Sequence, residues 1–406
     1  MRLKRFLQIT LGIVTSVGGF LEIGSITTAV QAGAVFGYQL LWAILLGTIC
    51  LIFLLEMSGR LSAVSKHTIV DATRDRFGFP FFAIILVGMV LVSFLVLVAE
   101  IGGIALSLQI LTGIGFPWWA IPVSVGVWLL IWKGTFSLIE NGVCILGLVT
   151  ISFVVAAIKL HPDWSSVATG FLTTVPHANK TRYGFIAVSI LGASISPYLM
   201  YFYSSGAIEE KWDESYLPIN RVIATIGMSF GGVLSMCVLV VAALALRPRG
   251  LDGGKFEQGA LMMTTALPKW GFYLFAASML IACLGAALEI SLAIAYFFAQ
   301  GFGWNWSENH EPAKDARFCF VYTIIILLAA VPLLLAFDPI RITIVSMALT
   351  SAALPLAIIP FLFLMNDPQY LGKHRNGWIA NTVVAVIILM SFVLAVISIP
   401  LEIAGG

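Results

Sequence analysis

Long apolar runs, separated by short polar stretches, follow one another along the whole chain. Several runs reach 18 or more residues with few charges, which is the length that an α-helix needs to cross a bilayer. Strands of a membrane barrel would alternate apolar and polar residues instead of continuing the apolar run. The pattern therefore predicts an all-α membrane protein with one polytopic domain over residues 1–406 and the lipid bilayer as its surroundings.

The apolar runs predict eleven membrane-spanning helices. Their approximate ranges are 8–34, 39–58, 81–111, 117–132, 141–160, 184–206, 221–246, 271–299, 318–336, 340–364 and 378–401. The fourth is short for a straight crossing, and Pro117 and Pro122 lie near its start, where proline disturbs helical hydrogen bonding.

The first of these spans is interrupted by a carboxylate and several glycines. Glu22 lies among Gly18, Gly19 and Gly24, and Ser25 follows. A carboxylate at the bilayer centre costs ~3 kcal/mol, so Glu22 is expected to face protein or water. Each glycine in a helix interior costs about 1 kcal/mol relative to alanine. The pattern predicts that the helix opens here beside a functional site; the simpler alternative is a structural carboxylate that caps the second half of the helix.

The sixth span carries a similar interruption. Pro197 removes a backbone donor inside the apolar run, and Ser194 and Ser196 place hydroxyls beside it. Two broken spans five helices apart predict two inverted repeats, about 8–160 and 184–364, with 378–401 as an extra span and a midplane site where the breaks meet. The alternative is that glycine and proline are simply common in membrane helices.

Composition and charge narrow the function. The chain is 60% hydrophobic and 10% charged, which excludes an ordinary soluble globule. It has no basic tract for nucleic acid, no Walker A pattern and no catalytic triad, so we expect neither an enzyme nor an ATP-driven pump, and no cofactor. Nothing in the sequence defines the oligomeric state.

The basic residues predict the orientation. Of the 22 lysines and arginines, 14 fall on the inner side and 8 on the outer side if the N-terminus is cytoplasmic. The C-terminus of an eleven-span protein then lies outside. We expect a retained first span and location in a bacterial plasma membrane.

Four segments of the chain follow a known pattern. They are Gln31–Trp42 at the end of span one and the start of span two, Val98–Gly102 in span three, Pro162–Phe171 between spans five and six, and Leu191–Ser205 in span six. Together they resemble the Nramp family of divalent-metal transporters. The resemblance implies the LeuT-type fold, a 5+5 inverted repeat with broken spans one and six, plus an eleventh helix.

The chain departs from this family at the positions that the resemblance assigns to the metal. Glu22-Ile23-Gly24-Ser25 stands where the family has Asp-Pro-Gly-Asn, and Ser196-Pro197-Tyr198-Leu199 stands where it has Met-Pro-His-Asn. Ala193 keeps a position whose backbone carbonyl is a ligand in the family. Met347 aligns with a span-ten position where the family often has glutamine. The substrate site implied by the resemblance therefore comprises Glu22, Gly24, Ser25, Ala193, Ser196, Tyr198 and Met347.

These replacements change the expected ion. With the span-six thioether gone, the expected metal ligands are Glu22, Ser25 and Ser196 with backbone carbonyls, an all-oxygen set that favours Mg²⁺ or Mn²⁺ over Fe²⁺ or Zn²⁺. The presence of only one carboxylate in this ligand set argues against a divalent ion. A monovalent ion, an anion or a small organic solute, with Glu22 titrating, is the alternative substrate, and a non-transporting sensor is a third hypothesis.

Proton coupling is expected to be weak or absent. Ser107 stands at the position of the family's span-three aspartate, and Tyr203 stands at that of its second span-six histidine. Neither replaces the lost acid–base group. Glu100 is retained and remains a candidate for the proton pathway. The alternative is a structural role, in which its carboxylate bonds to the backbone of a broken helix. Glu289, in span eight, either lines the pathway or has a structural role.

Overall fold

The chain forms a bundle of helices, described here from a computed structural model. The structure describes residues 21–133, 148–172, 179–268, 270–308, 310, 312 and 314–403. The predicted beginnings of spans one and five, at 8–20 and 141–147, lie outside these residues. Apart from short 3₁₀ turns, the elements in the described part are α-helices. They are α2 (Ile23–Phe36), α3 (Leu41–Ser65), α4 (Ile69–Phe77), α5 (Phe79–Thr112), α6 (Phe116–Lys133), α8 (Ser152–Lys159), α9 (Trp164–Thr169), α10 (Lys180–Ser194), α11 (Pro197–Glu209), α12 (Leu217–Ala245), α13 (Phe256–Ala266), α14 (Gly271–Gly301), α15 (Ala316–Leu334), α16 (Pro339–Asn366), α17 (Pro368–Leu371) and α18 (Trp378–Ile403).

The helices confirm the predicted all-α membrane architecture. Within the described residues, eight helical stretches are long and apolar enough to cross a membrane. Three shorter apolar segments, Ile23–Phe36, Val149–Lys159 and Trp378–Val393, lie at the places of predicted spans one, five and eleven. Each predicted span therefore has a helical counterpart.

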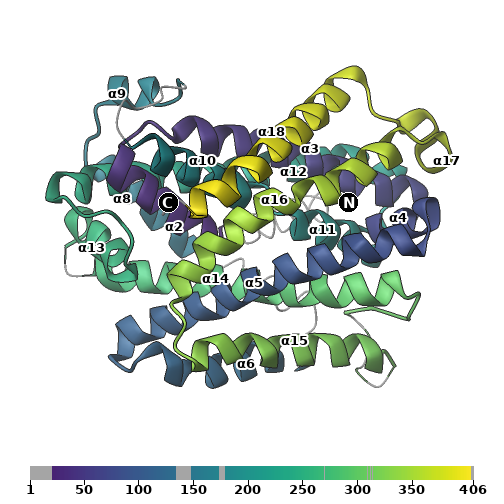
Figure 1. Cartoon of the computed structure of the whole chain (residues 1–406), viewed down its shortest axis with the longest axis horizontal. Helices are drawn as coiled ribbons and strands as arrows, with labels where there is room; N and C mark the ends of the chain where they lie inside the picture. Colours follow the sequence, from purple (N-terminus) through teal and green to yellow (C-terminus); the bar gives the residue numbers. More distant parts are fainter. Residues whose placement is uncertain are drawn as a thin grey trace.

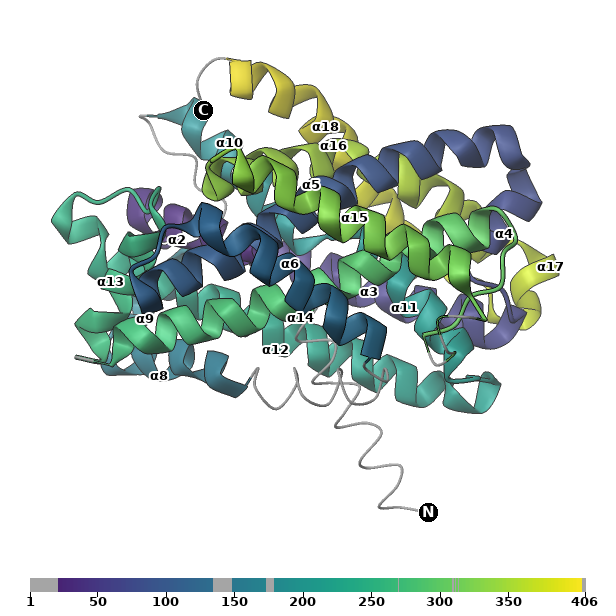
Figure 2. The ribbon, with the colours of Figure 1, turned by 90° about the horizontal axis from the view of Figure 1, so that it is seen from below.

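The connecting helices gather at two opposite ends of the bundle. In both views the long helices run along the length of the molecule, with α4 and α17 at one end and α9 and α13 at the other (Figures 1 and 2). The helices α4 and α17 follow spans two and ten, whereas α9 and α13 follow spans five and seven. Helices that follow even-numbered spans thus lie at one end and those that follow odd-numbered spans lie at the other, as expected for spans that cross in alternating directions. The cytoplasmic assignment of the α4 end stays a prediction.

The core is built around two sets of contacts. Helix α5 packs against α14 and α16, and α12 packs against α2 and α3. Helices α2 and α12 touch through their backbones: a Cβ built on Gly33 would lie 2.2 Å from the carbonyl oxygen of Leu239. Small residues permit such close approach between membrane helices, where packing stabilises association.

We expect Gly33→Ala to lower the free energy of unfolding by about 1–3 kcal/mol, because a methyl group would push α2 away from α12. Thermal unfolding in detergent, followed by tryptophan fluorescence, measures the loss. Gly126→Ala in α6 is the matched control, since a Cβ there meets nothing within 4 Å. Equal stability of the two variants would show that the close approach of α2 and α12 is not needed.

Candidate functional site

The break in span six separates α10 from α11. Helix α10 ends at Ser194 and α11 begins at Pro197, and Ile195 and Ser196 between them have non-helical backbone angles. The interruption therefore precedes Pro197, which was expected to mark it. Proline suits the first position of a helix because its missing N–H has no partner there and its φ is already helical.

The break in span one is visible at its second half. Glu22 is extended, with φ −122° and ψ 169°, and α2 begins at the next residue. The Ser25 hydroxyl accepts a hydrogen bond from the Glu22 N–H at 3.1 Å and is 3.0 Å from the Glu22 carbonyl oxygen, to which it donates. Ser25 was expected to be a ligand, and in this structure its hydroxyl closes the first turn of its own helix.

The Glu22 carboxylate lies where the two breaks meet. It is fully buried, and it accepts hydrogen bonds from Ser196 Oγ at 3.2 Å and from Tyr198 Oη at 2.9 Å. The Ser196 hydroxyl also lies 3.3 Å from the Ala193 carbonyl oxygen, so one proton has two acceptors within reach. The salt bridges of the described residues all lie elsewhere. Glu22 therefore has hydroxyl partners and no basic partner in the described chain.

Helix α16 reaches this site through Met347. A Cβ built on Gly24 would lie 2.5 Å from Met347 Cε, so the methionine side chain rests directly on the first turn of α2. Helix α16 approaches α10 equally closely at Gly192, where a built Cβ would lie 2.2 Å from the Met347 carbonyl oxygen. The seven residues expected at the site are thus brought together from α2, α10, α11, α16 and the two breaks.

Glu100 on α5 holds the beginning of α2. Its two carboxylate oxygens lie 3.1 and 3.3 Å from the Ile23 nitrogen and accept its N–H. This N–H is one of those that a helix leaves without an internal partner, and a carboxylate there also faces the positive end of the helix dipole. The Cys283 thiol of α14 lies close to the same carboxylate. This geometry fits the structural role expected as the alternative for Glu100, a bond to the backbone of a broken helix.

The other two proton-pathway candidates lie away from Glu22. The Ser107 hydroxyl donates to the Gly103 carbonyl of its own helix at 2.8 Å. The Tyr203 hydroxyl donates to Asn220 Oδ1 at 2.9 Å, towards α12. Neither side chain hydrogen-bonds to Glu22 or Glu100 in the described structure.

Two residues of α14 stand close to this group of side chains. Glu289 is partly buried and near enough to interact electrostatically with the Tyr198 hydroxyl, as Glu22 and Glu100 also do. Cys283 of the same helix packs against Gly103 of α5, where a Cβ would lie 2.5 Å from Cys283 Sγ.

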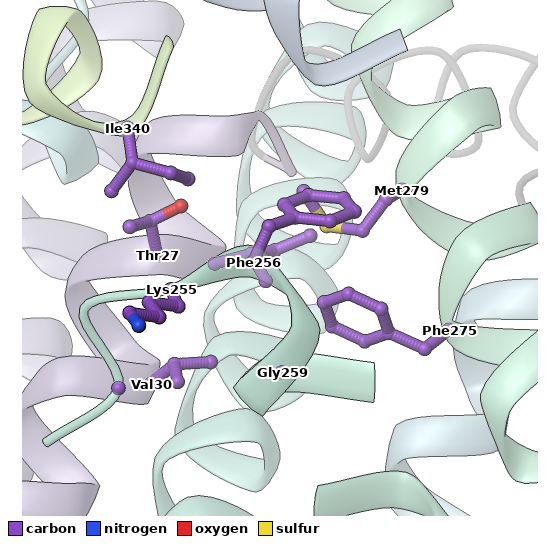
Figure 3. A pocket seen from close by; sticks show the side chains of 10 residues that line it. Thr27, Val30, Lys255, Phe256, Gly259, Phe275, Met279 and Ile340 are labelled. Atoms are coloured by element: carbon purple, nitrogen blue, oxygen red, sulfur yellow. The ribbon is translucent and has the colours of Figure 1, made fainter. Parts of the chain in front are cut away.

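A small pocket lies beyond Glu22, towards the α13 end of the molecule. It measures about 10 Å³ and is enclosed by α2, α13, α14 and α16. Phe256 of α13 stands between Thr27 and the Phe275 ring, and Lys255 lies at the edge (Figure 3). Such a volume holds about one water molecule.

The groups around Glu22 that could bind a cation present oxygen atoms. The described residues contain no group of three or more histidine, cysteine, aspartate and glutamate side chains placed to hold a metal ion. A cation at this site would rely on one carboxylate together with hydroxyl and carbonyl oxygens. Hydroxyl groups suit this use because each oxygen can turn from donating a proton to presenting a lone pair.

Comparison with known families covers nearly the whole chain. The sequence profile of the family described as Nramp, natural resistance-associated macrophage protein-like, matches residues 12–400. A divalent metal cation transporter (MntH) of Deinococcus radiodurans is 27% identical over 391 residues, covering 93% of this chain and 86% of that protein. The MntH of Klebsiella pneumoniae subsp. pneumoniae is 25% identical, covering 92% of this chain and 90% of that protein.

Solved structures show the same fold at lower identity. The Eremococcus coleocola manganese transporter has a TM-score of 0.79 at 20% identity, over 98% of this chain and 87% of that one. Mhp1, a nucleobase-cation-symport-1 family transporter, has a TM-score of 0.64 at 16% identity, over 97% of this chain and 91% of that one. These similarities confirm the expected LeuT-type fold.

Proposed function

We propose that this chain, which belongs to the Nramp family, is a secondary transporter of a hard divalent cation, with Mg²⁺ or Mn²⁺ as the favoured ion. The observation that carries the proposal is the Glu22 carboxylate, which is fully buried where two broken helices meet and accepts hydrogen bonds from the Ser196 and Tyr198 hydroxyls. Removing a charge from water costs several kcal/mol per ion unless it is paired. A transported cation would supply the opposite charge. The names of the relatives, divalent metal cation transporters, support the same substrate class.

The ligand set supports a hard ion. Glu22 supplies the charge, Ser196 and Tyr198 supply hydroxyl oxygens, and the Ala193 carbonyl lies beside Ser196. Oxygen ligands are typical of Mg²⁺ and Mn²⁺ sites, and Mg²⁺ keeps part of its water shell. We place the protein in the plasma membrane with its N-terminus in the cytoplasm, on the distribution of its basic residues.

Uptake by the purified protein in liposomes tests the substrate. Mg²⁺, Ca²⁺, Mn²⁺ and Na⁺ are offered in turn, and calorimetric titration follows binding in parallel. We expect saturable uptake of Mg²⁺ or Mn²⁺ that protein-free liposomes do not show. A protein that takes up no divalent cation, or that takes up Na⁺ alone, would contradict the proposal.

We further propose that transport is coupled to protons weakly or not at all. The support is that Ser107 and Tyr203 bond to groups other than Glu22, and that Glu100 bonds to the backbone of α2. With a pH-sensitive dye inside the liposomes, we expect divalent uptake to leave the internal pH unchanged and to persist without a pH gradient. Acidification in step with uptake would contradict weak coupling.

A further inference from the structure

An apolar groove opens between α5, α6 and α14. Its volume is about 500 Å³, and Leu108 of α5, Leu284 of α14 and Leu130 of α6 are among the residues that line it. A Cβ built on Gly126, also on the α6 wall, would meet nothing within 4 Å. The α6 wall extends from Trp119 to Leu130, roughly 16 Å at 1.5 Å per residue. This is about half of the ~30 Å hydrocarbon thickness of a bilayer, the depth of one leaflet.

A basic side chain stands at one end of this groove. Leu129 and Leu130, which line the groove, are 40% and 41% exposed, so the groove is open to the surroundings of the bundle. Lys133 follows them by four and three residues in the last turn of α6, the spacing that places side chains on one face of a helix. Since α5 begins beside α4 and α6 runs back along α5, Lys133 lies at the α4 end.

Helix α15 brings a second cation to the same level. It packs against α6 (Figure 2) and begins at the α4 end, because the preceding helix α14 ends against α4. Trp128 Nε1 of α6 donates to Thr323 Oγ1 of α15 at 2.9 Å. Lys133 lies beyond Trp128 and Arg317 lies before Thr323, and at 1.5 Å per residue each is roughly 8–9 Å towards the α4 end.

These cations are exposed and have no ion-pair partner within the described residues. Lys314 joins them just before α15, and the salt bridges of the described chain involve neither these residues nor Lys133. Asp315, the carboxylate next to Lys314, is buried and bonds to His310 at 2.9 Å. The Arg317 guanidinium lies over the Trp304 ring, 5.6 Å from its centroid. A stacked guanidinium is held in place while its N–H groups can still bind a phosphate.

We propose that this groove binds an anionic phospholipid, with an acyl chain between α5, α6 and α14 and the phosphate between Lys133, Lys314 and Arg317. Basic groups beside a membrane helix attract anionic headgroups, and an apolar groove of one leaflet's depth suits the chain attached to such a headgroup. An apolar helix of another protein would match the groove but not the three cations at its end, whereas the phospholipid matches both. The site does not include Glu22, so the proposal is independent of the transported ion.

Lipid binding to the purified full chain tests the proposal. The protein is freed of lipid in detergent and titrated with phosphatidylglycerol or with phosphatidylcholine of the same acyl chains, and native mass spectrometry counts the bound lipid. We expect one phosphatidylglycerol to bind at least about tenfold more tightly than phosphatidylcholine. The soluble fragment sn-glycerol 3-phosphate is expected not to displace it, because the buried chain supplies part of the affinity. Equal binding of the two lipids, or displacement by the fragment, would overturn the proposal without any variant.

Two variants separate the headgroup from the chain. Lys133→Gln, Lys314→Gln and Arg317→Gln together are expected to weaken phosphatidylglycerol binding about 100-fold, since each basic group near an anionic lipid contributes roughly a factor of five. Gly126→Phe keeps all three charges and fills the groove. We expect it to weaken binding about tenfold, the effect of withdrawing about two methylene groups from the groove.

The matched control changes three exposed basic residues at the opposite end of the bundle, Lys159→Gln, Lys180→Gln and Arg341→Gln. It is expected to bind phosphatidylglycerol as the wild type does. Equal losses in the control and in the charge variant, or wild-type binding by Gly126→Phe, would overturn the proposal. A protein that binds no lipid and forms a dimer that Gly126→Phe abolishes would also overturn it, because a second copy would then occupy the groove. These measurements involve no transport, so their failure leaves the proposed function intact.

Discussion

Glu22→Gln is expected to reduce divalent uptake by at least about 100-fold while the protein remains folded. Leaving a buried charge without its partner costs about 3–5 kcal/mol, and each 1.4 kcal/mol is a factor of about ten in affinity. The cation bound at this position would lose the charged ligand that lies beside the hydroxyls of Ser196 and Tyr198. Glutamine has the shape of glutamate and keeps an acceptor oxygen, so the hydroxyls retain a partner. Initial rates of Mn²⁺ and Mg²⁺ uptake in liposomes measure the effect.

Glu214→Gln is a suitable control for the chemistry of the substitution. Glu214 is exposed, lies beyond the end of α11 and pairs with Lys373 at 3.6 Å. Exposed pairs of this kind contribute roughly 0–1 kcal/mol, so its uptake should match the wild type. If Glu22→Gln also matched the wild type, Glu22 would be a structural cap and not the cation ligand.

The architecture was largely predictable because membrane helices have a simple sequence signature. The lengths of the apolar runs predicted the spans, and Glu22 and Pro197 marked the two breaks in the sequence. The position of the second break was predicted less well. Proline starts α11 instead of lying inside the break, because the preceding residues, Ile195 and Ser196, leave the helix first.

The contacts made by individual hydroxyls were not predictable from the resemblance. Ser25 and Ser107 were given roles by their aligned positions, but both hydroxyls bond to backbone oxygens of their own helices. Serine side chains compete in this way for nearby carbonyls, and the choice depends on the rotamer. An alignment predicts the position of a residue along the chain but not the direction in which its side chain points.

The packing of Met347 against Gly24 and Gly192 brings together residues that are far apart in the sequence. Gly24 and Gly192 are separated by most of the first repeat, and each looks like an ordinary membrane-helix glycine in sequence. Their shared partner on α16 emerges only when the three helices are packed together. The alignment gave Met347 a position at the site, but its packing against both broken helices follows only from the fold.

Glu100 offers the second large effect, and comparing two substitutions separates its two roles. We expect Glu100→Ala to lower the free energy of unfolding by about 1–3 kcal/mol, because the buried Ile23 N–H would lose its acceptor. We also expect it to lower cation uptake about tenfold, since the first turn of α2 carries Glu22 and Gly24. Thermal unfolding in detergent and uptake in liposomes give the two quantities.

Glu100→Gln decides between a carboxylate that holds α2 and one that carries protons. The glutamine oxygen still accepts the Ile23 N–H, and only the attraction to the helix dipole is lost, about 0.3–1 kcal/mol. If Glu100 acts by holding the helix, Glu100→Gln keeps uptake within about twofold of the wild type while Glu100→Ala does not. A proton carrier would give a different pattern: glutamine cannot release a proton, so both variants would lose uptake alike. Since Ser107 and Tyr203 form no relay to Glu100 in the described structure, we expect the first pattern: the span-three glutamate serves transport by fixing the backbone that presents Glu22.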